Sequence, residues 1–354
     1  MSALFDPLTI GNVEFPNRIW VSPMCQYMAT DGFVGQWHDV HLGSFATGGT
    51  GLIMVEATGV VPEGRISIGC PSIEDDEHAA AFAPIIHFAH EHGVKMGIQL
   101  AHAGRKAGTA LPWADHKMAT PEEGGWQAVS SSAIAFDGYP EPRALSIAEI
   151  HQLTQDFAAA AKRAVEVGFD VIELHAAHGY LMHQFYSPLA NTRTDEYGGS
   201  FDNRIRFLIE TVDAVKAAIP AGTPLFVRIS ATDWVDNGWN LIDSVELCTQ
   251  LKAHGVDLVD VSTGGNVHNA PIKATPGFQV PFATAIRAET GIMTTAVGLI
   301  TEPEQADHII QTGEADAVFM AREFLRNPRF PLYAAEKLGV KIQWPLPIER
   351  GKKL

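Results

Sequence analysis

The sequence predicts an α/β protein folded as a single (β/α)8 TIM barrel domain that spans residues 1–354. Three observations support this prediction. Eight short β-rich runs recur along the chain, amphipathic helical stretches follow most of them, and a glycine or proline leads into each new run. Alternating strands and helices are typical of a parallel sheet, and eight such units close a barrel. A doubly wound open sheet is the alternative, but no GxGxxG motif follows the first run.

The eight predicted strands are mostly continuous apolar runs without strict alternation. This pattern suits strands that are buried on both faces of a parallel sheet. The runs are Ile19–Met24, Gly51–Glu56, Lys95–Ala101, Asp170–His175, Pro224–Ile229, Asp257–Val261, Ile292–Val297 and Ala317–Met320. The clearest helix is Ser146–Val167, which starts with a Ser–x–x–Glu capping box and stops at Gly168. Other predicted helices are Phe201–Ile219, Asp243–His254 and Glu302–Thr312.

Three segments lie outside this repeat. Pro7–Pro16, with Gly11-Asn12 between short apolar runs, predicts a β-hairpin that plugs the N-terminal end of the barrel. Residues 104–143 are rich in glycine, proline and polar residues, and too long for a simple loop, so we expect a capping subdomain over the C-terminal face. Residues 340–354 form a tail beyond the last barrel helix.

Composition excludes several classes of partner. The formal net charge is -16, and an acidic surface repels both nucleic acid and anionic membranes. No run approaches the roughly 18 apolar residues of a membrane helix, and we find no signal peptide. The three cysteines are odd in number, far apart and not in a CxxC pair. We therefore expect reduced thiols in a cytoplasmic protein.

Functional side chains of a (β/α)8 barrel project from the C-terminal ends of its strands. Those positions hold a coherent set of residue types: Ser22, Pro23, Met24 and Cys25 after the first strand, Ala57 after the second, Gln99 in the third, His175 to Tyr180 after the fourth, Arg228 in the fifth, Gly298 after the seventh, and Ala321 and Arg322 after the eighth.

His175, His178 and Tyr180 form the sharpest motif. One interpretation is a pair of hydrogen-bond donors for a substrate oxygen, with Tyr180 as the proton donor. A second is a transition-metal site, although only Glu56 and Glu173 lie near enough in the pattern to add acidic ligands. A third is a pair of structural histidines. Residue chemistry favours the first interpretation, without a metal.

Arg228 interrupts an apolar strand, and a buried arginine needs an anion or an acceptor-rich group beside it. The N1–C2 carbonyl edge of a flavin would serve, and so would an internal salt bridge to Asp260 or Glu173. Gly264-Gly265, Gly298 and Arg322 together predict a phosphate site at the last strands.

Three further residue types are open to two interpretations. The Cys25 thiol can tune a flavin carbonyl or can simply be a small buried hydrophobe. Tyr27, Trp113 and Trp126 can line an apolar pocket, and ordinary core packing explains the tryptophans equally well.

The chain resembles the old yellow enzyme family of flavin ene-reductases. The resemblance runs from Leu4-Phe5-Asp6-Pro7-Leu8 to Ala321-Arg322-Glu323-Phe324-Leu325. Its most specific part is the segment 175–204, HAAHGYLMHQFYSPLANTRTDEYGGSFDNR. The run SPMCQY at 22–27 resembles the thermophilic-like bacterial branch, in which a cysteine replaces a threonine.

The resemblance implies a role for each matching residue. FMN would be bound by Ser22, Pro23, Met24, Cys25, Ala57, Gln99, Arg228, Gly298, Ala321 and Arg322. His175 and His178 would bind the substrate oxygen, Tyr180 would protonate the substrate, and Tyr27 would contact it. Arg350 would reach the site of a neighbouring subunit in a homodimer or homotetramer, although Ile348 stands where an aromatic residue often precedes the Glu-Arg pair.

The resemblance also implies the reaction. NADPH or NADH would reduce FMN, and the flavin would then reduce the C=C bond of an enone, enal or nitroalkene by ping-pong kinetics. Two other functions remain open from the residues alone. One is a metal-dependent barrel hydrolase that uses His175 and His178 as ligands, and the other is a flavin-binding protein without catalytic activity.

Overall fold

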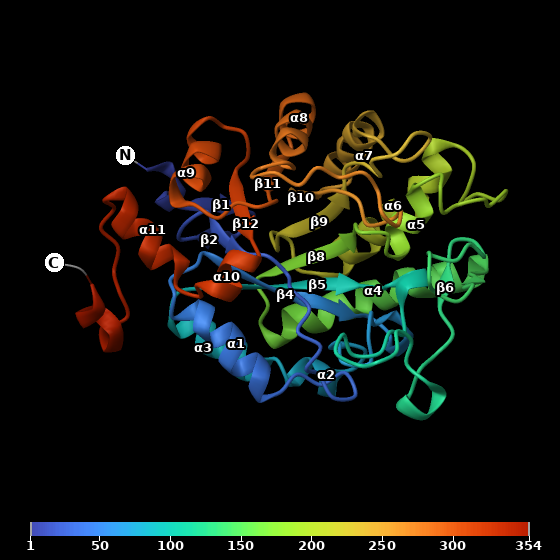
Figure 1. Ribbon diagram of the computed structural model, residues 1–354, viewed down its shortest axis with the longest axis horizontal. Helices are drawn as coiled ribbons and strands as arrows, with labels where there is room; N and C mark the ends of the chain where they lie inside the picture. The colour runs from blue at the N-terminus through green and yellow to red at the C-terminus, as the bar shows by residue number, and fades with distance from the viewer. Residues whose placement is uncertain (1, 353–354) are drawn as a thin grey trace.

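The computed structural model describes residues 2–352 and confirms the predicted barrel. Eight parallel strands close in the order β10-β11-β12-β3-β4-β5-β8-β9, and the helices form a ring around them (Figure 1). The strands are β3 Ile19–Val21, β4 Leu52–Gly59, β5 Lys95–Ala101, β8 Val171–Ala176, β9 Leu225–Ser230, β10 Leu258–Ser262, β11 Met293–Ala296 and β12 Ala317–Met320. Each corresponds to one predicted run.

The strand bounds differ from the predicted ones mainly at the first two strands. β3 ends at Val21, where the chain leaves the sheet. The Ser22 amide still donates to the carbonyl of Met320 in β12 at 3.0 Å. Ser22, Met24 and Cys25 therefore lie on a loop over the C-terminal end of the barrel. β4 runs on to Gly59, with a register shift against β5 after Val55.

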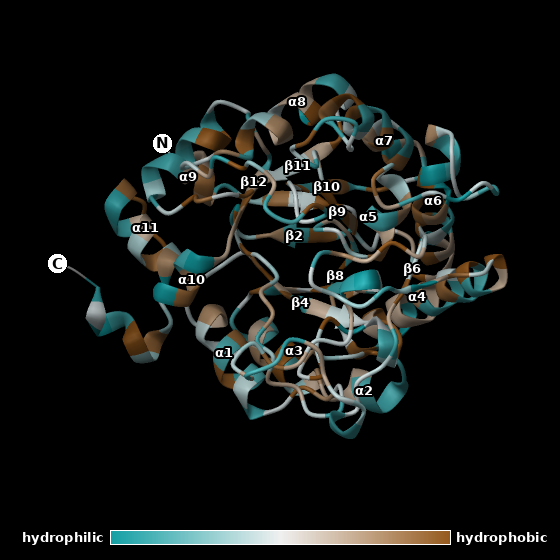
Figure 2. Cartoon of the chain, turned by 45° about the vertical axis from the view of Figure 1, so that its right-hand side comes forward, coloured by the Kyte–Doolittle hydropathy of each residue, from teal (hydrophilic) through white to brown (hydrophobic). Residues whose placement is uncertain are grey.

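The longest helix, α4, is amphipathic, and Figure 2 shows polar and apolar residues along it. As predicted, α4 begins after Ser146, whose hydroxyl accepts from the Glu149 amide at 3.3 Å, and it ends at Gly168 with φ 116°. The α-helices are α1 Gln36–Ala46, α2 Asp76–Ala80, α3 Ala83–Glu91, α4 Ile147–Val167, α5 Leu181–Tyr186, α6 Phe201–Ala218, α7 Leu241–Ala253, α8 Val280–Thr290, α9 Pro303–Gln311, α10 Arg322–Arg326 and α11 Phe330–Leu338. The 3-10 helices are η1 Ala3–Phe5, η2 Pro62–Gly64, η3 Gly104–Lys106, η4 Pro121–Glu123 and η5 Leu346–Gly351. No helix in the range 2–352 is both long and apolar enough to cross a membrane.

The N-terminal hairpin fills one end of the barrel, as predicted. β1 Leu8–Ile10 pairs with β2 Val13–Phe15 in antiparallel register. The Phe15 ring lies 4.8 Å from Trp20 of β3 and 6.5 Å from Phe226 of β9, measured between ring centroids. These side chains and their apolar neighbours from the other strands form a separate core cluster. This end of the barrel interior is therefore closed to solvent.

The insertion after β5 packs over the opposite end. Its two short strands, β6 Val129–Ser130 and β7 Arg143–Ala144, pair in parallel. The Ser131 hydroxyl donates to the carbonyls of Gln184 and Ala190, both at 2.8 Å. These bonds tie the insertion to the segment that follows β8, which is the C-terminal face of the barrel. The tail lies at the edge of the molecule beyond α11 (Figure 1).

Candidate active site

A tight turn after β8 places the predicted histidines and tyrosine together. His178 has φ 58° and Gly179 has φ 72°, both in the left-handed region that suits glycine. A Cβ on Gly179 would collide with the carbonyl of Gly265, and a Cβ on Gly265 would lie 2.6 Å from the Cα of His178. Glycine is therefore required on both sides of this backbone contact. Gly265, which the sequence placed in a phosphate site, serves the turn instead.

Two buried side chains, His183 and Asp233, hold this turn in place. The Gly179 amide donates to Nδ1 of His183 at 2.9 Å, so Nε2 of that ring carries the proton. His183 Nε2 lies 3.0 Å from a carboxylate oxygen of Asp233, and both side chains are fully buried. The other Asp233 oxygen accepts from the Ser187 hydroxyl at 2.7 Å and from the Trp239 amide at 2.9 Å.

His175 presents a neutral imidazole with a defined tautomer. Burial, with a smaller contribution from the charge of Arg228, lowers the pKa of His175 well below its usual value. The Ala177 amide donates to His175 Nδ1 at 3.2 Å, so the ring proton is on Nε2. The His175 ring lies almost perpendicular to the ring of His178 at 5.2 Å and to that of Tyr180 at 4.9 Å. His175 is thus a hydrogen-bond donor beside both partners.

His178 is also neutral, and its tautomer depends on Ser262. Burial and then Arg228 lower the pKa of His178 well below its usual value. Its Nε2 lies 2.7 Å from the Ser262 hydroxyl, which also has the amide oxygen of Gln279 within 3.3 Å. When Ser262 donates to His178 along the shorter contact, the ring proton is on Nδ1. The free nitrogen of His178 is then a second donor.

Tyr180 lies beside a cavity of about 520 Å³ that Tyr27 and Lys106 also line. Burial raises the pKa of Tyr180 well above its usual value, so the phenol keeps its proton at neutral pH. Lys106 donates to the carbonyls of His178 at 2.8 Å and Gly265 at 3.0 Å. Its ammonium lies 5.0 Å from the centre of the Tyr180 ring.

A layer of polar side chains crosses the barrel interior at the same end. The amide of Gln99 in β5 donates to Glu173 of β8 at 2.7 Å, and Arg228 Nε of β9 lies 3.0 Å from Asp260 of β10. Asp260 also accepts from Thr295 of β11 at 2.8 Å. The strand register sets these pairs side by side. Burial and the neighbouring Asp260 raise the pKa of Glu173 to about 8.

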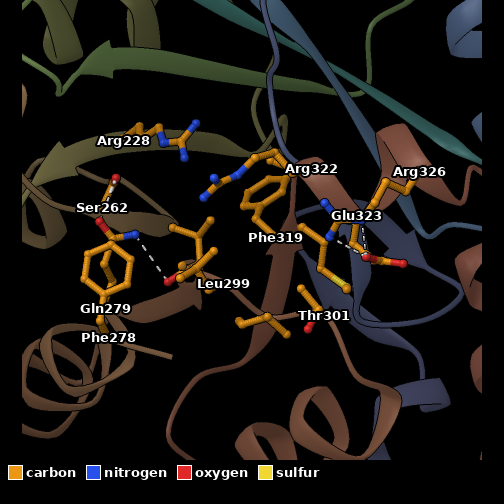
Figure 3. Close-up of a pocket in the computed structure, with 15 residues that line it drawn as sticks. Arg228, Ser262, Phe278, Gln279, Leu299, Thr301, Phe319, Arg322, Glu323 and Arg326 are labelled. Atoms are coloured by element: carbon orange, nitrogen blue, oxygen red, sulfur yellow. Dashed lines mark hydrogen bonds and ion pairs between the residues drawn. The ribbon is translucent and has the colours of Figure 1, made fainter. Parts of the chain in front are cut away.

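The salt bridge to Asp260, one of the two partners considered from the sequence, is therefore present. It uses Nε of Arg228 and leaves the rest of the guanidinium directed to a second cavity of about 220 Å³. Gly298, Ala321 and Arg322 also line this cavity, and the Arg322 guanidinium extends from α10 toward Arg228 (Figure 3). Among the cavity-lining residues drawn in Figure 3, Arg322 has no acidic partner.

The other predicted residues differ in how close they come to these cavities. Cys25 and Tyr27 pack with Ala57 in an apolar cluster that also contacts Tyr180. Trp126 packs at the edge of that cluster, whereas Trp113 is 62% exposed and serves neither cavity. Arg350 is exposed on η5, and no residue of the described tail lines the two cavities within this chain.

Sequence reasoning missed Lys106, Ser262 and Gln279. Lys106 lies in η3, beyond the end of β5, so the strand-end rule does not reach it. The signal was present, since Arg105 and Lys106 are two adjacent cations in a segment otherwise rich in glycine and alanine. Ser262 ends β10 and would have been found by the same strand-end rule applied to the sixth strand.

The geometry gives the histidine pair no metal site. Two clusters of three or more potential ligands occur in the range 2–352, and neither contains His175 or His178. A hydrolase that uses this pair as metal ligands would lack the further ligands it needs.

Comparison with known proteins identifies the family. A model of the NADH:flavin oxidoreductase / NADH oxidase family matches residues 3–340. The chain belongs to this family. It is 47% identical over 353 residues to the NADPH dehydrogenase of Geobacillus thermodenitrificans, covering 99% of this chain and 98% of that protein. It is 46% identical over 351 residues to the NADPH dehydrogenase of Bacillus subtilis, covering 98% of each.

Solved structures of family members have the same fold. Morphinone reductase superposes with a TM-score of 0.80 at 27% identity, over 97% of this chain and 91% of that one. The old yellow enzyme homologue from Zymomonas mobilis gives 0.79 at 28% identity, over 96% and 94%. The predicted membership of the old yellow enzyme family is confirmed. The chain is an FMN-dependent oxidoreductase that uses NAD(P)H.

The residues fit this cofactor. Gly298 has φ 118°, and a Cβ there would lie 3.0 Å from the Gln279 amide nitrogen and 3.1 Å from the Phe278 ring. A bare backbone thus borders the cavity that the Arg228 and Arg322 guanidinium groups also line, which is suited to a phosphate. Arg228 at the other side can neutralise the carbonyl edge of a flavin.

Proposed function

We propose that this oxidoreductase reduces the C=C bond of α,β-unsaturated carbonyl and nitro compounds in the cavity beside Tyr180. The observation that carries the proposal is the close packing of two neutral imidazoles with one protonated phenol, since the His175 ring lies 5.2 Å from the His178 ring and 4.9 Å from the Tyr180 ring. Two donors can share a single substrate oxygen, and a phenol beside them can deliver a proton to a neighbouring carbon.

The cofactor would be held along the strand ends. Its ring system would be held by Arg228, Gln99, Ser22, Pro23, Met24, Cys25 and Ala57. Gly298, Ala321 and Arg322 would bind the phosphate. FMN, when bound, supplies the hydride that it takes from NAD(P)H.

The two histidines would polarise the substrate. His175 donates from Nε2, and His178 donates from Nδ1 when Ser262 holds its Nε2. Negative charge that develops on the substrate oxygen is stabilised by both donors. Because both rings are neutral, they stabilise this charge without giving up a proton to the oxygen.

Tyr180 would protonate the α-carbon on the side of the substrate opposite the hydride. Its raised pKa keeps the proton on the phenol until the substrate carbon becomes basic. Lys106, above the same ring, offsets the negative charge that the phenol acquires. Tyr27, which lines the same cavity, would contact the substrate.

The test compares the purified enzyme with Tyr180→Phe. Both should be yellow, release FMN on denaturation and bleach when NADPH is added. Only the parent should then recover its colour rapidly with an enone, because Phe cannot supply the proton. A variant that reoxidises at the parental rate, or a colourless protein that contains stoichiometric zinc, would contradict the proposal.

We also propose that the enzyme is a cytoplasmic homodimer or homotetramer whose sites are completed by Arg350. The tail carries this residue away from the cavities of its own chain. Mixing Tyr180→Phe chains with chains truncated before Pro345 tests the idea. Mixed oligomers should regain activity that neither parent has, whereas a fully active truncated chain would rule out a role for the tail.

A further inference from the structure

Two cysteines that lie far apart in the sequence meet beside the active site. Cys25 follows β3, and Cys70 lies on the loop after η2. The loops touch through their backbones, since the Ala29 amide donates to the Gly69 carbonyl at 2.9 Å. A Cβ on Gly69 would lie 2.6 Å from the carbonyl oxygen of Tyr27, so glycine permits this approach.

The two thiols are close enough to interact. The sulfur atoms of Cys25 and Cys70 and a carboxylate oxygen of Glu56 all lie within 4.8 Å of one another. The Cys25 thiol is within hydrogen-bonding reach of Cys70. Cys70 is fully buried and Cys25 is partly exposed.

Cys25, Cys70 and Glu56 could in principle form a metal site, but the partners of Glu56 argue against one. One Glu56 oxygen accepts from the Gln26 amide at 2.8 Å, and the other lies 3.3 Å from His38 Nε2. The Gly35 amide donates to His38 Nδ1 at 3.1 Å, so His38 Nε2, the nitrogen beside Glu56, carries a ring proton. Both carboxylate oxygens already have partners, which leaves two sulfurs and too few ligands for a tetrahedral ion.

We propose that Cys25 and Cys70 are a redox-active pair that a hydroperoxide converts to a reversible disulfide. Sulfur of Cys25 first takes one oxygen from hydrogen peroxide and becomes a sulfenic acid, and one water is released. Sulfur of Cys70 then attacks the sulfenic sulfur, the S–S bond forms, and a second water leaves with the Cys70 proton. Overall two thiols lose two electrons and two protons, and one peroxide becomes two waters.

The burial of the two cysteines indicates which thiol reacts with the peroxide first. Cys25 is the thiol that a small peroxide can reach, and Cys70 is the resolving thiol behind it. The hydrogen bond to Cys70, followed by burial, raises the pKa of Cys25 well above its usual value. The neutral thiol reacts slowly, so the pair responds to sustained rather than brief peroxide.

Oxidation would alter the active site. Cys25 packs in the apolar cluster that contacts Tyr27 and Tyr180. A disulfide of about 2.05 Å draws its sulfur toward Cys70 and removes the S–H group from this cluster. We expect loss of enone reduction, a consequence that rests on the proposed function. The disulfide itself does not.

The experiment treats the reduced holoenzyme with hydrogen peroxide, removes the peroxide, blocks free thiols and maps the peptides by mass spectrometry. We expect a Cys25–Cys70 cross-linked peptide and titration of one thiol where the reduced enzyme has three. Cys248 should stay free, because it is fully buried in a separate part of the core. Dithiothreitol should restore all three thiols and the lost activity.

Two variants serve as matched controls. Cys248→Ser should keep the disulfide, whereas Cys70→Ser should lack it and lose activity irreversibly as Cys25 is oxidised further. If Cys70→Ser folds poorly, peptide mapping of the parent enzyme alone decides the matter. Three free thiols after peroxide, irreversible oxidation of Cys25 in the parent, or zinc bound at one ion per chain to this pair would each overturn the proposal. An intact disulfide with unchanged activity would contradict only the placement of Cys25 in the active site.

Discussion

The two ends of the barrel interior are formed by the same strands, but one end is apolar and the other is polar. At the N-terminal end, Phe15, Trp20 and Phe226 stack into an apolar plug. At the C-terminal end, Gln99 and Arg228 belong to a buried polar layer. Phe226 and Arg228 are two residues apart on β9, so they project into the same interior at successive levels.

This difference separates stability from chemistry. The plug of Phe15, Trp20 and Phe226 makes apolar contacts that stabilise the fold, and none of these three rings lines either cavity. The polar layer keeps charged and amide groups out of water, which is costly unless each finds a partner. The polar layer therefore serves binding and chemistry, because it presents polar groups to a bound cofactor and substrate. Substitutions at the two ends should have opposite signatures.

The largest effect is expected at the plug. Trp20→Ala removes a fully buried ring that contacts Phe15, Phe226 and Phe319, and should lower the free energy of unfolding by about 3–5 kcal/mol. Urea denaturation measures this change. Enone turnover per folded molecule should stay near the parental value. Trp113→Ala, at an exposed tryptophan, is the control and should change stability by less than about 0.5 kcal/mol.

The histidine pair should show the reverse signature. His175→Ala and His178→Ala each remove one donor to the substrate oxygen, which typically costs about 2.7–4 kcal/mol in the transition state. Stopped-flow reoxidation by an enone measures the loss. FMN content and reduction by NADPH should be retained. If either variant lost FMN in place of reactivity, that ring would belong to the cofactor site.

Sequence reasoning succeeded where local pattern determines structure. The eight apolar runs, the Ser146 capping box and the N-terminal hairpin follow from periodicity and turn chemistry, which act over a few residues. The strand-end rule found His175, Arg228 and Gly298 because a barrel gathers these positions at one face. The positions of the histidine pair, and of Arg228, Gly298, Ala321 and Arg322 in the arginine-lined cavity, are therefore predictable from the sequence alone, whereas Ser262 and Gln279 of the same cavity were missed.

Contacts between distant segments were not accessible in this way. Lys106 reaches the carbonyls of His178 and Gly265 from an insertion whose path no local pattern specifies. The meeting of Cys25 with Cys70 depends on how two loops pack. The double role of Arg228 could be posed as two alternatives, but only the folded chain shows that one nitrogen pairs with Asp260 while the guanidinium still faces the cavity.

Ser262 gives a smaller and more specific prediction at the polar end. Ser262→Ala removes the group that holds His178 Nε2 at 2.7 Å, and should slow enone reduction by about tenfold, the worth of one hydrogen bond of about 1.4 kcal/mol. The ¹⁵N shifts of the His178 ring should report a mixture of tautomers. Thr263→Val is the matched control, because it removes a bond to Gln279 at 2.6 Å without touching His178. Equal losses in both variants would assign the effect to Gln279.

The smallest effect is expected at Lys106, and it has a characteristic pH dependence. Burial, aided by the charges of Arg105 and Lys117, lowers the pKa of Lys106 to about 8. Its ammonium is therefore charged below about pH 8 and neutral above it. A cation above the Tyr180 ring stabilises the negative charge left when the phenol gives up its proton, by about 0.5–1 kcal/mol.

Enone reduction by the parent enzyme should therefore fall about two- to fivefold as pH rises through 8, while Lys106→Met should be slow and flat across the same range. Lys117→Met sharpens the test. Removing that positive neighbour raises the pKa of Lys106, so the fall should move to higher pH with no loss at pH 7. A fall near pH 8 that persists in Lys106→Met would assign the titration to another group, and would reduce Lys106 to a support for the turn that carries His178.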